Sequence, residues 1–340
     1  MDRSRTDATH NRRALVTGAT GQDGSYLCEL LLNKGYDVVG TTRNIAGPAA
    51  RRLMELLDPV AAGGRFRLVA LDLADGARIH QLVRELEPQE IYNLASQSHV
   101  GQSFASPLET LQANASGTLA LLEAIRRMPA ASPVRMYQAS SSEMFGAPSA
   151  CPQNESTPFH PRSPYACAKV CAYHLCVQYR ESYELFVSNG ILFNHESPRR
   201  PPEYVTRKIT RAAARIAAGL DRELTLGNLQ VGRDWGFAGD YVEAMWRMLQ
   251  HDRPDDFCVA TNQWHRLEDF LDTAFTRVRL NWRDFVRSDP ALCRPAEVTR
   301  LQGDYAKAEH CLGWRPRTSF AELVHMMVDA DVAGLKEPAH

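Results

Sequence analysis

The stretch RALVTGATGQDGSYLCELLLNKGYDVVGTTRN, residues 13–44, decides the fold. It opens with a short apolar run, Ala14 to Val16, and continues with a tyrosine and leucines spaced as on one face of a helix. Gly35 ends this helical pattern, and YDVVGTT resumes as a strand. The order of strand, glycine turn, helix and strand is that of a βαβ unit, which predicts that the two strands pair in parallel.

Three glycines, Gly18, Gly21 and Gly24, occupy the predicted turn between strand and helix. Because they lack side chains, backbone N–H groups there can approach a pyrophosphate at the helix N-terminus. A glycine triplet alone is weak evidence, but its place between a strand and a helix predicts dinucleotide binding. Where NAD-binding proteins usually offer an acid to the ribose, this chain has Arg43, which favours the 2′-phosphate of NADP. The alternative is a solvated arginine at a strand end.

The alternation of strand and helix continues beyond residue 44. FRLVALDLAD (66–75) and EIYNLASQSHV (90–100) each read as a strand followed by polar residues. This alternation predicts an α/β protein with a Rossmann-type, doubly wound parallel sheet and a smaller C-terminal substrate-binding domain. The predicted divisions are a disordered tail at 1–12, a dinucleotide-binding domain at 13–192 plus about 236–262, and a substrate domain at about 193–235 plus 263–336.

Composition sets limits on partners and location. The 340 residues carry 39 Lys+Arg against 40 Asp+Glu, a net charge of −1, so the overall charge indicates neither nucleic acid nor an anionic membrane as a partner. No segment approaches the ~18 uninterrupted apolar residues of a membrane span. The eight cysteines include no Cys-x-x-Cys pair, which argues against a metal site and favours reduced thiols in a cytoplasmic protein. The polar N-terminus lacks the apolar segment of a signal peptide.

The segment MYQASSSEMFG, residues 136–146, begins like a buried strand and ends in three serines and the acid Glu143. In open α/β sheets the carboxyl ends of the strands are where ligands bind, so this acid is a candidate for chemistry. The alternative is a serine-rich turn with a solvated glutamate. The position of Glu143 at the end of a strand is compatible with both alternatives and does not decide between them.

Tyr165 and Lys169 are four residues apart in a segment with helical apolar spacing, so they project from one face of the helix. An ammonium beside a phenol stabilises the phenolate, which lowers the pKa of the tyrosine and makes it usable as a general base. Tyr-x-x-x-Lys by itself is common, but downstream of a nucleotide-binding turn and a serine-ended strand it predicts a catalytic group.

These motifs resemble the short-chain dehydrogenase/reductase superfamily in its extended form, because the glycine spacing is Gly-x-x-Gly-x-x-Gly and a serine precedes Tyr-x-x-x-Lys. Longer strings narrow the likeness, and from residue 13 to about 330 the chain resembles GDP-mannose 4,6-dehydratases. NGILFNHESPRR is the most specific of them. The others are TGATGQDGSYL, IYNLASQSHV, YQASSSEMFG, PRSPYACAK, VTRKI, RDWGFAGDYVEAMW and LQGDYAKAEHCLGWRPR.

The resemblance assigns roles to particular residues. The implied catalytic group is Ser141, where the family usually has threonine, with Glu143, Tyr165 and Lys169. The implied cofactor contacts are Gly18, Thr20, Gly21, Gln22, Asp23, Gly24, Arg43, Asp72, Leu73, Ala95, Gln97, Tyr165 and Lys169. The implied substrate contacts are Ser98, His99, Asn194, Glu196, Arg200, Lys208, Arg233, Arg294 and Glu297, with Arg207 adding to a basic pocket. Each of these charges has the alternative of a solvated surface position, and His99 that of a structural histidine.

The implied activity is that of an NADP-dependent lyase which converts GDP-mannose to GDP-4-keto-6-deoxy-mannose. Tyr165 would take the C4 hydroxyl proton during hydride transfer, and Ser141 would hydrogen-bond the C4 oxygen. The ketone at C4 makes the C5 proton acidic, so Glu143 would remove it and protonate the departing C6 hydroxyl. An epimerase or a reductase needs no such carboxylate.

Several positions depart from the family pattern. The loop 44–52 differs from the longer loop that the family uses to reach a neighbouring subunit, so either a homodimer or a homotetramer is expected, with helices at 108–128 and 165–183 as the dimer surface. His160 stands for a usual tyrosine, Phe237 for a usual histidine, and PPEY (201–204) for a glycine-led stretch.

Three alternatives to the main interpretation stay open. The first is the same chemistry on another GDP-sugar such as a GDP-manno-heptose, and the second is a nucleotide-sugar epimerase or reductase. The third is a non-catalytic NADP-sensing protein. The sensing hypothesis predicts decay of the catalytic set, whereas all four residues of that set are present.

Overall fold

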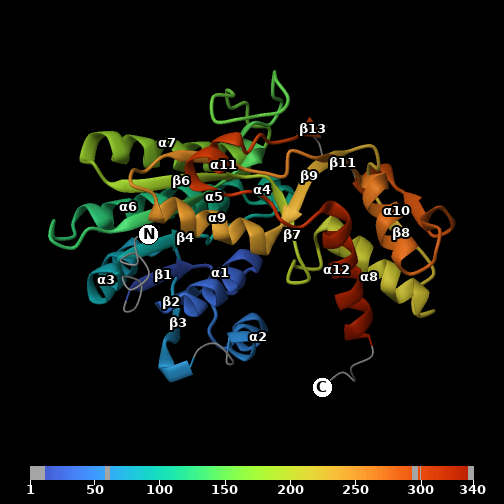
Figure 1. Ribbon diagram of the computed structural model, residues 1–340, viewed down its shortest axis with the longest axis horizontal. Helices are drawn as coiled ribbons and strands as arrows, with labels where there is room; N and C mark the ends of the chain where they lie inside the picture. Colours follow the sequence, from blue (N-terminus) through green and yellow to red (C-terminus); the bar gives the residue numbers. More distant parts are fainter. Residues whose placement is uncertain (1–11, 58–61, 293–297, 299, 336–340) are drawn as a thin grey trace, which may run out of the picture.

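Seven parallel strands form the sheet that the glycine-turn unit predicts (Figure 1). The structure, a computed structural model, describes residues 12–57, 62–292, 298 and 300–335. The strand order is β10-β6-β5-β4-β1-β2-β3, and every neighbouring pair is parallel. The bounds are β1 (Arg13–Thr17), β2 (Asp37–Thr42), β3 (Phe66–Ala70), β4 (Glu90–Asn93), β5 (Arg135–Ser141), β6 (Phe186–Leu192) and β10 (Asp256–Val259). The predicted doubly wound α/β fold is confirmed.

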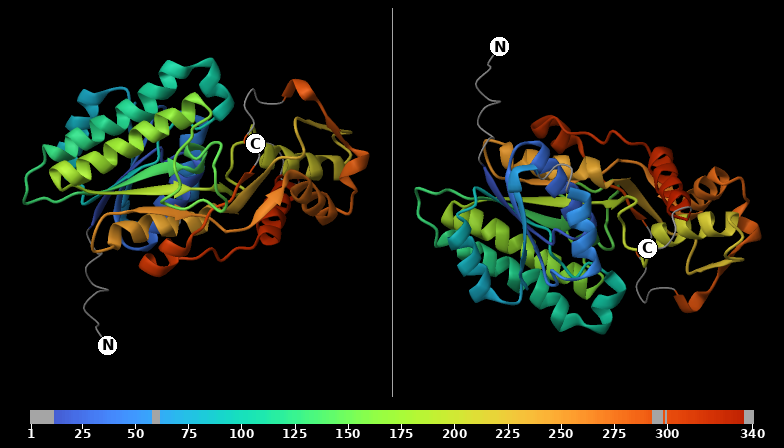
Figure 2. Two further views of the ribbon diagram at one scale, coloured as in Figure 1. Left: turned by 90° about the horizontal axis from the view of Figure 1, so that it is seen from above. Right: turned by 90° about the horizontal axis from the view of Figure 1, so that it is seen from below.

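Helices cover both faces of this sheet (Figure 2). One layer holds α1 (Gln22–Asn33), α2 (Pro48–Leu57), α9 (Ala238–Gln250) and α11 (Ala306–Leu312). The other layer holds α3 (Gly76–Leu86), α6 (Gly117–Arg126) and α7 (Pro164–Tyr183), and α4 (Val100–Ala105), α5 (Pro107–Leu111) and the π-helical turn η3 (Gln112–Ser116) lead into it. Each face of the sheet is therefore buried, as a parallel sheet requires.

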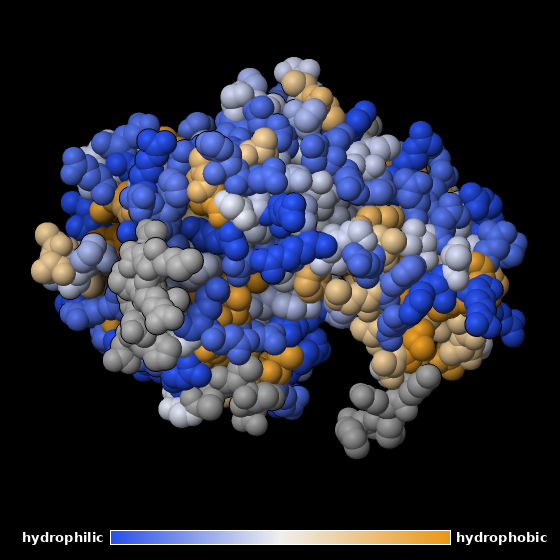
Figure 3. Space-filling model, viewed as in Figure 1, coloured by the Kyte–Doolittle hydropathy of each residue, from blue (hydrophilic) through white to orange (hydrophobic). Residues whose placement is uncertain are grey.

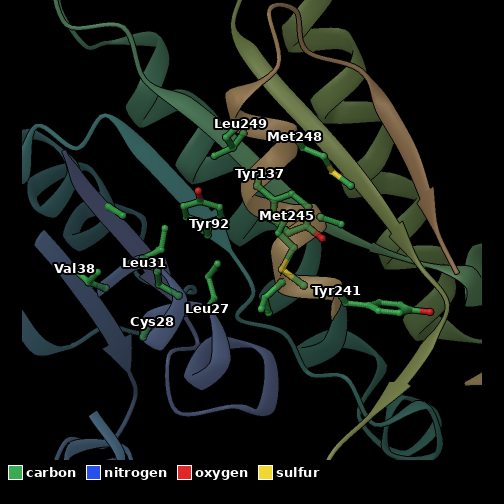
Figure 4. Packing of buried hydrophobic residues seen from close by; sticks show 14 of the residues in the cluster. Leu27, Cys28, Leu31, Val38, Tyr92, Tyr137, Tyr241, Met245, Met248 and Leu249 are labelled. Carbon is green, nitrogen blue, oxygen red and sulfur yellow. The ribbon is translucent and has the colours of Figure 1, made fainter. Parts of the chain in front are cut away.

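Helix α1 is fixed by the apolar stripe visible in the sequence. Leu27 and Leu31 are fully buried and face the sheet tyrosines Tyr92 and Tyr137, while Met245 closes the cluster from α9 (Figure 4). Burial of each such side chain stabilises the fold by about 1.5–3 kcal/mol. The N-terminus of α1 consequently points at the carboxyl edge of the sheet, directly after the glycine turn.

After β6 the chain leaves the sheet and builds a smaller lobe. There β9 (Gly232–Phe237) pairs with β7 (Asn194–Glu196), β11 (Trp264–Arg266) and β13 (Arg300–Leu301). A second small sheet joins β8 (Leu224–Leu226) to β12 (Val286–Ser288). The lobe's helices are α8 (Val205–Ala217), α10 (Leu267–Arg277) and α12 (Phe320–Gly334). Short helical turns lie at η2 (Ala62–Gly64), η4 (Ser142–Met144), η5 (Trp282–Asp284) and η6 (Pro290–Leu292).

The chain returns to the main sheet for α9 and β10 before it enters the lobe again. The points where the chain passes between the main sheet and the smaller lobe fall near residues 192, 236 and 262. The domain division predicted at these residues stays a prediction. In the space-filling view, a notch separates the sheet-bearing body from the smaller lobe, and the visible surface is mostly hydrophilic (Figure 3). Within the described residues, none of the helices has the length and apolarity needed to cross a membrane.

Candidate active site

A cavity of about 960 Å³ lies where the smaller lobe faces the carboxyl edge of the seven-stranded sheet. Except for Arg207, the predicted site residues that the structure describes all line it. They are Gly18, Thr20, Gly21, Gln22, Asp23, Gly24, Arg43, Asp72, Leu73, Ala95, Gln97, Ser98, His99, Ser141, Glu143, Tyr165, Lys169, Asn194, Glu196, Arg200, Lys208 and Arg233. The two remaining predictions, Arg294 and Glu297, lie outside the described residues.

The glycine turn after β1 leaves no room for side chains. Gly18 has a φ of +68°, and a Cβ placed on it would lie 2.9 Å from the backbone of Ala95. A Cβ on Gly24 would lie 2.3 Å from the carbonyl oxygen of Gly18. Both positions therefore require glycine, and the close packing leaves the backbone at the start of α1 open to the cavity.

Gln22 and Asp23 follow this turn, but their side chains bind protein groups of the lobe. Gln22 Nε2 donates to the carbonyl oxygen of His195 at 3.0 Å, and Gln22 Oε1 accepts from Ser197 Oγ at 2.8 Å. Asp23 Oδ2 lies 2.9 Å from His195 Nε2. Neither His195 nor Ser197 was singled out from the sequence, although both stand within the NHESPRR string.

Tyr165 and Lys169 project from the first turns of α7, where Ser163 caps the helix by accepting from the Ala166 amide and Pro164 follows the cap. This start places both side chains under the end of β5. Lys169 Nζ donates to the carbonyl oxygen of Ala139 at 2.9 Å. Burial lowers the pKa of Lys169 to about 8.

The predicted lowering of the pKa of Tyr165 by Lys169 is wrong for this structure. Burial raises the pKa of Tyr165, and its hydrogen bond with Ser141 offsets only part of that rise. Lys169 Nζ lies 5.8 Å from the centroid of the Tyr165 ring and is bonded to Ala139. The buried phenol is therefore neutral here, and Ser141 is its polar partner.

Glu143 lies in the short turn η4 that follows β5. Ser141 caps this turn, since its Oγ accepts from the Glu143 amide at 3.2 Å. The Glu143 carboxylate is 4.0 Å from Arg233 Nη2, and both side chains are largely buried. Arg233 also donates to the carbonyl oxygens of Gly232 and Val298, at 2.8 and 2.7 Å. Glu143 and Arg233, whose guanidinium is fixed by two backbone carbonyls, thus face the same cavity as Tyr165.

Fewer basic side chains face the cavity than the sequence predicts. Arg200 Nε pairs with Glu196 at 3.0 Å, and Glu196 also accepts from Thr206 at 2.7 Å, so this acid is occupied by protein groups. Lys208 lines the cavity, whereas Arg207 does not. Arg207 pairs with Asp331 on α12, so its predicted place in the basic pocket is wrong.

Tyr204 connects the two sides of the cavity. Its hydroxyl lies 2.9 Å from Ser98 Oγ, and its ring lies under the Arg200 guanidinium, 3.7 Å from it. The neighbouring His99 accepts from the Gln102 amide through Nδ1 and so caps α4, which is the structural role considered as its alternative. Sequence reasoning noted the segment 201–204 as unusual without naming Tyr204.

Comparison with known proteins identifies the family. Residues 15–327 match the family model described as GDP-mannose 4,6 dehydratase. The chain is 53% identical over 323 residues to "GDP-mannose 4,6 dehydratase 2" of Arabidopsis thaliana, which covers 94% of this chain and 86% of that protein. The chain belongs to the GDP-mannose 4,6-dehydratase family.

Solved structures agree with this family at the level of the fold. RMD from Pseudomonas aeruginosa, complexed with NADPH, matches with a TM-score of 0.76 and 25% identity over 95% of this chain and 99% of that one. DesIV, a dTDP-glucose 4,6-dehydratase from Streptomyces venezuelae with NAD and TYD bound, matches with a TM-score of 0.82 and 25% identity over 96% and 99%.

The departures from the family pattern differ in their distance from the cavity. Pro201, Glu203 and Tyr204 line it, whereas His160 and Phe237 are absent from its described lining. Phe237 packs edge-on against Tyr26, with ring centroids 5.5 Å apart. Among the described residues, the departures that reach the cavity are therefore Ser141, Asn44 at the start of the loop 44–52, and the segment 201–204.

Proposed function

We propose that the protein is an NADP-dependent GDP-mannose 4,6-dehydratase, a lyase that forms GDP-4-keto-6-deoxy-mannose. The proposal rests on family membership and on one feature of the site: Glu143 faces the same cavity as Ser141, Tyr165 and Lys169. Oxidation and reduction at C4 need the serine, tyrosine and lysine alone. Removal of water across C5 and C6 needs an additional acid and base, which Glu143 supplies.

The residues present fit a nicotinamide dinucleotide. The glycine turn admits close approach of a pyrophosphate to the N-terminus of α1, as the clashes of a Cβ at Gly18 and Gly24 indicate. Arg43 lines the cavity beside the end of β2 and offers a cation to a 2′-phosphate. RMD binds NADPH, which supports NADP, whereas DesIV binds NAD. When bound, the cofactor supplies storage for one hydride, taken from C4 and returned to C6.

The protein's own residues handle the protons of the first step. Tyr165 takes the proton of the C4 hydroxyl, and Ser141, its hydrogen-bond partner, holds the C4 oxygen. Since burial raises the pKa of Tyr165, the phenolate needs positive charge nearby when the substrate reacts. The buried ammonium of Lys169, on the same helix face, provides part of it.

Elimination follows from the ketone at C4, which acidifies the proton at C5. Glu143 removes this proton and then, in its acid form, protonates the departing C6 hydroxyl, so that one water leaves. A bound cofactor would return the hydride to C6. C5 takes a proton from solvent, and Tyr165 releases to solvent the proton that it took from the C4 hydroxyl, so Tyr165 and Glu143 both return to their starting forms. Arg233 Nη2 lies 4.0 Å from the carboxylate and lines the same cavity.

The diphosphate is assigned to Arg200, Lys208 and Arg233, which line the cavity on its lobe side. Arginine suits this role because its planar guanidinium binds phosphate oxygens in pairs. The same chemistry on a different GDP-sugar is the second candidate, favoured by the unusual segment 201–204 at the cavity wall.

The protein is proposed to act in the cytoplasm as a homodimer or homotetramer. Apolar side chains are exposed on the helices around α6, with Leu108 81% and Leu111 47% exposed. This apolar surface supports pairing of α5, α6 and α7 with a second copy. Light scattering at micromolar concentration is expected to show at least a dimer, and a monomer would refute the assembly.

The activity is tested by incubating the purified protein with GDP-mannose, GDP-manno-heptose and other GDP-sugars without added cofactor. A 4-keto-6-deoxy product from GDP-mannose is expected, because the hydride is returned and no net oxidant is used. An epimerised sugar, or turnover that requires stoichiometric NADPH, would instead support the epimerase or reductase alternative.

A further inference from the structure

Gln22 joins two segments that are 175 positions apart in the sequence. It is the first residue of α1 and directly follows Gly21 of the glycine turn. Its amide is used in both directions, as a donor to the His195 carbonyl at 3.0 Å and as an acceptor from Ser197 Oγ at 2.8 Å. Gln22 is 6% exposed and Ser197 is fully buried. A side chain of the cofactor turn is thus bonded to the segment around β7.

Asp23 and His195 add a buried ion pair to this contact. His195 Nδ1 lies 2.8 Å from the Phe193 carbonyl oxygen, and Nε2 lies 2.9 Å from Asp23 Oδ2. Both partners are acceptors, so both ring nitrogens carry hydrogens and the imidazole is a cation. Burial opposes both charges, yet their attraction lowers the pKa of Asp23 and raises that of His195, with Arg200 as the other charge facing the pair.

These four residues, Gln22, Asp23, His195 and Ser197, are called the clamp below. On one side of it stands the glycine turn, and on the other stands Asn194, which begins β7 and lines the same cavity. Strand β7 is itself held in register on β9, with Asn194 opposite Trp235. The clamp therefore sets the separation between the cofactor turn and the strand that carries a predicted sugar contact.

We propose that the clamp residues are positioning residues for hydride transfer. This inference rests on the proposed function. Transfer requires reacting atoms about 3–3.5 Å apart, and a misplacement of ~1 Å lowers the rate by about 10²-fold. The hydrogen bonds of the Gln22 and Ser197 side chains all go to protein groups: to each other, to the His195 carbonyl, to Asp23 and to the Arg199 amide. These two residues therefore act on the alignment of the two binding segments and little on the affinity for either ligand.

The same two segments also touch outside the cavity, which provides a matched control. Arg199 Nη2 pairs with Glu29 Oε2 of α1 at 2.7 Å, and its guanidinium lies 3.7 Å from the Tyr26 ring centroid. Neither Arg199 nor Glu29 is among the cavity's lining residues. Glu29→Gln weakens contact between the segments but leaves the clamp intact.

The first test uses hydrogen exchange and needs no turnover. Addition of NADPH, or of NADH if only NADH binds, is expected to protect the amides of residues 194–197 in the wild type and in Glu29→Gln. In Gln22→Met, which keeps the side-chain length but removes the hydrogen bonds to His195, Ser197 and Asp23, this protection is lost. Equal protection in Gln22→Met would overturn the proposal. Ser197→Ala repeats the test should Gln22→Met fold poorly.

The second test separates rate from affinity. In Gln22→Met and Ser197→Ala, kcat for GDP-mannose is expected to fall roughly 10- to 100-fold, while KM and the Kd for NADPH stay within about threefold. The isotope effect from deuterium at C4 is expected to rise, because hydride transfer becomes rate-limiting. An unchanged kcat, or a loss confined to KM and Kd, contradicts the proposal. A wild type inert toward GDP-mannose rejects the proposed function instead, and hydrogen exchange then decides the clamp.

Discussion

Glu90 begins β4 and Glu143 follows β5, so two acids of neighbouring strands stand at opposite edges of the same sheet. Glu90 is 1% exposed and accepts from Arg12, Tyr36 and Gln250 through Oε1, at 3.0–3.1 Å, and from Tyr92 through Oε2 at 2.7 Å. This group of five residues is called the amino-edge network. Both oxygens of its carboxylate accept hydrogen bonds from protein groups.

Glu143 at the carboxyl edge is held differently. Its backbone is fixed by Ser141, but within the described part of the chain its carboxylate has a single ion-pair contact, Arg233 at 4.0 Å. A second hollow, of about 1420 Å³, lies at the amino edge and is lined by Glu90, so the presence of a hollow does not by itself identify the site. A buried carboxylate stabilises the fold where protein groups satisfy its hydrogen bonds, and it is available for chemistry where those bonds are left to a ligand.

The largest expected effect compares two tyrosines. Tyr165→Phe removes the hydroxyl that meets the substrate and is expected to lower turnover on the order of 10²–10⁴-fold while leaving stability nearly unchanged. Its matched control is Tyr36→Phe, which removes a hydroxyl from the amino-edge network and should cost about 1 kcal/mol of stability with normal turnover. Product formation and denaturant unfolding measure the two quantities, and similar effects of both variants would break the comparison.

Removal of the network's acid should affect folding and spare catalysis. Glu90→Ala leaves buried hydroxyls and the Arg12 guanidinium without their acceptor, so the free energy of unfolding is expected to fall by about 2–4 kcal/mol. Residual folded enzyme should keep its kcat. A Glu90→Ala protein as stable as the wild type would show that the network is not a stabilising element.

Removal of the Lys169 charge is expected to raise stability, whereas removal of Glu90 lowers it. Its folded pKa of about 8 lies below the usual lysine value, so at pH 7 its buried ammonium costs folding free energy, and this cost is lost as pH rises from 8 towards 10.5. Lys169→Met should therefore be inactive but more stable at pH 7, by ~1–3 kcal/mol, with the gain vanishing near pH 10.5.

The matched control for that variant is Lys34→Met at the amino edge. Lys34 Nζ lies 3.6 Å from the Trp246 ring centroid, so its removal should lower stability by about 0.5–1 kcal/mol. Thermal unfolding of both variants across pH 7 to 10.5 checks the signs. If Lys169→Met is less stable than the wild type at pH 7, the buried Lys169 ammonium does not destabilise the fold and the prediction is wrong.

The smallest expected effect concerns the cofactor. Arg43→Asp should narrow or reverse the preference for NADPH over NADH, by about tenfold or more in relative Kd, because a carboxylate repels a 2′-phosphate and accepts from a ribose diol. Arg67→Asp, an exposed change on the neighbouring β3, is the control and should leave the ratio unchanged. A wild type that prefers NADH would refute the role of Arg43.

Local patterns in the sequence predicted the parts of the molecule that depend on local spacing. The glycine turn, the strand ends and the i, i+4 pair Tyr165 and Lys169 are each encoded within one or two elements, and the structure places them as expected around the sheet edge. The resemblance to the family added the lobe-side residues, which periodicity alone does not reveal.

Other features depend on contacts that no local pattern encodes. Strand β7 has three residues, and the bond between Gln22 and Ser197 spans 175 positions, so neither leaves a periodic signal. Arg207 and Lys208 are adjacent on α8, and the helix phase relative to α12 sends one to Asp331 and the other to the cavity. The pKa of Tyr165 is raised by desolvation, and Lys169, the partner that the motif supplies, is bonded to the Ala139 carbonyl instead.

The central claim is that the Glu143 carboxylate carries out the elimination, and deuterium incorporation tests it most directly. In deuterated water the wild type is predicted to place deuterium at C5 of the 4-keto-6-deoxy product, because that proton is removed and replaced. Glu143→Gln, nearly the same shape but unable to take a proton, is predicted to bind NADPH and GDP-mannose normally, and to form product on the order of 10²–10⁴-fold more slowly with little deuterated sugar. Near-normal turnover with deuterium at C5 in Glu143→Gln would contradict the account.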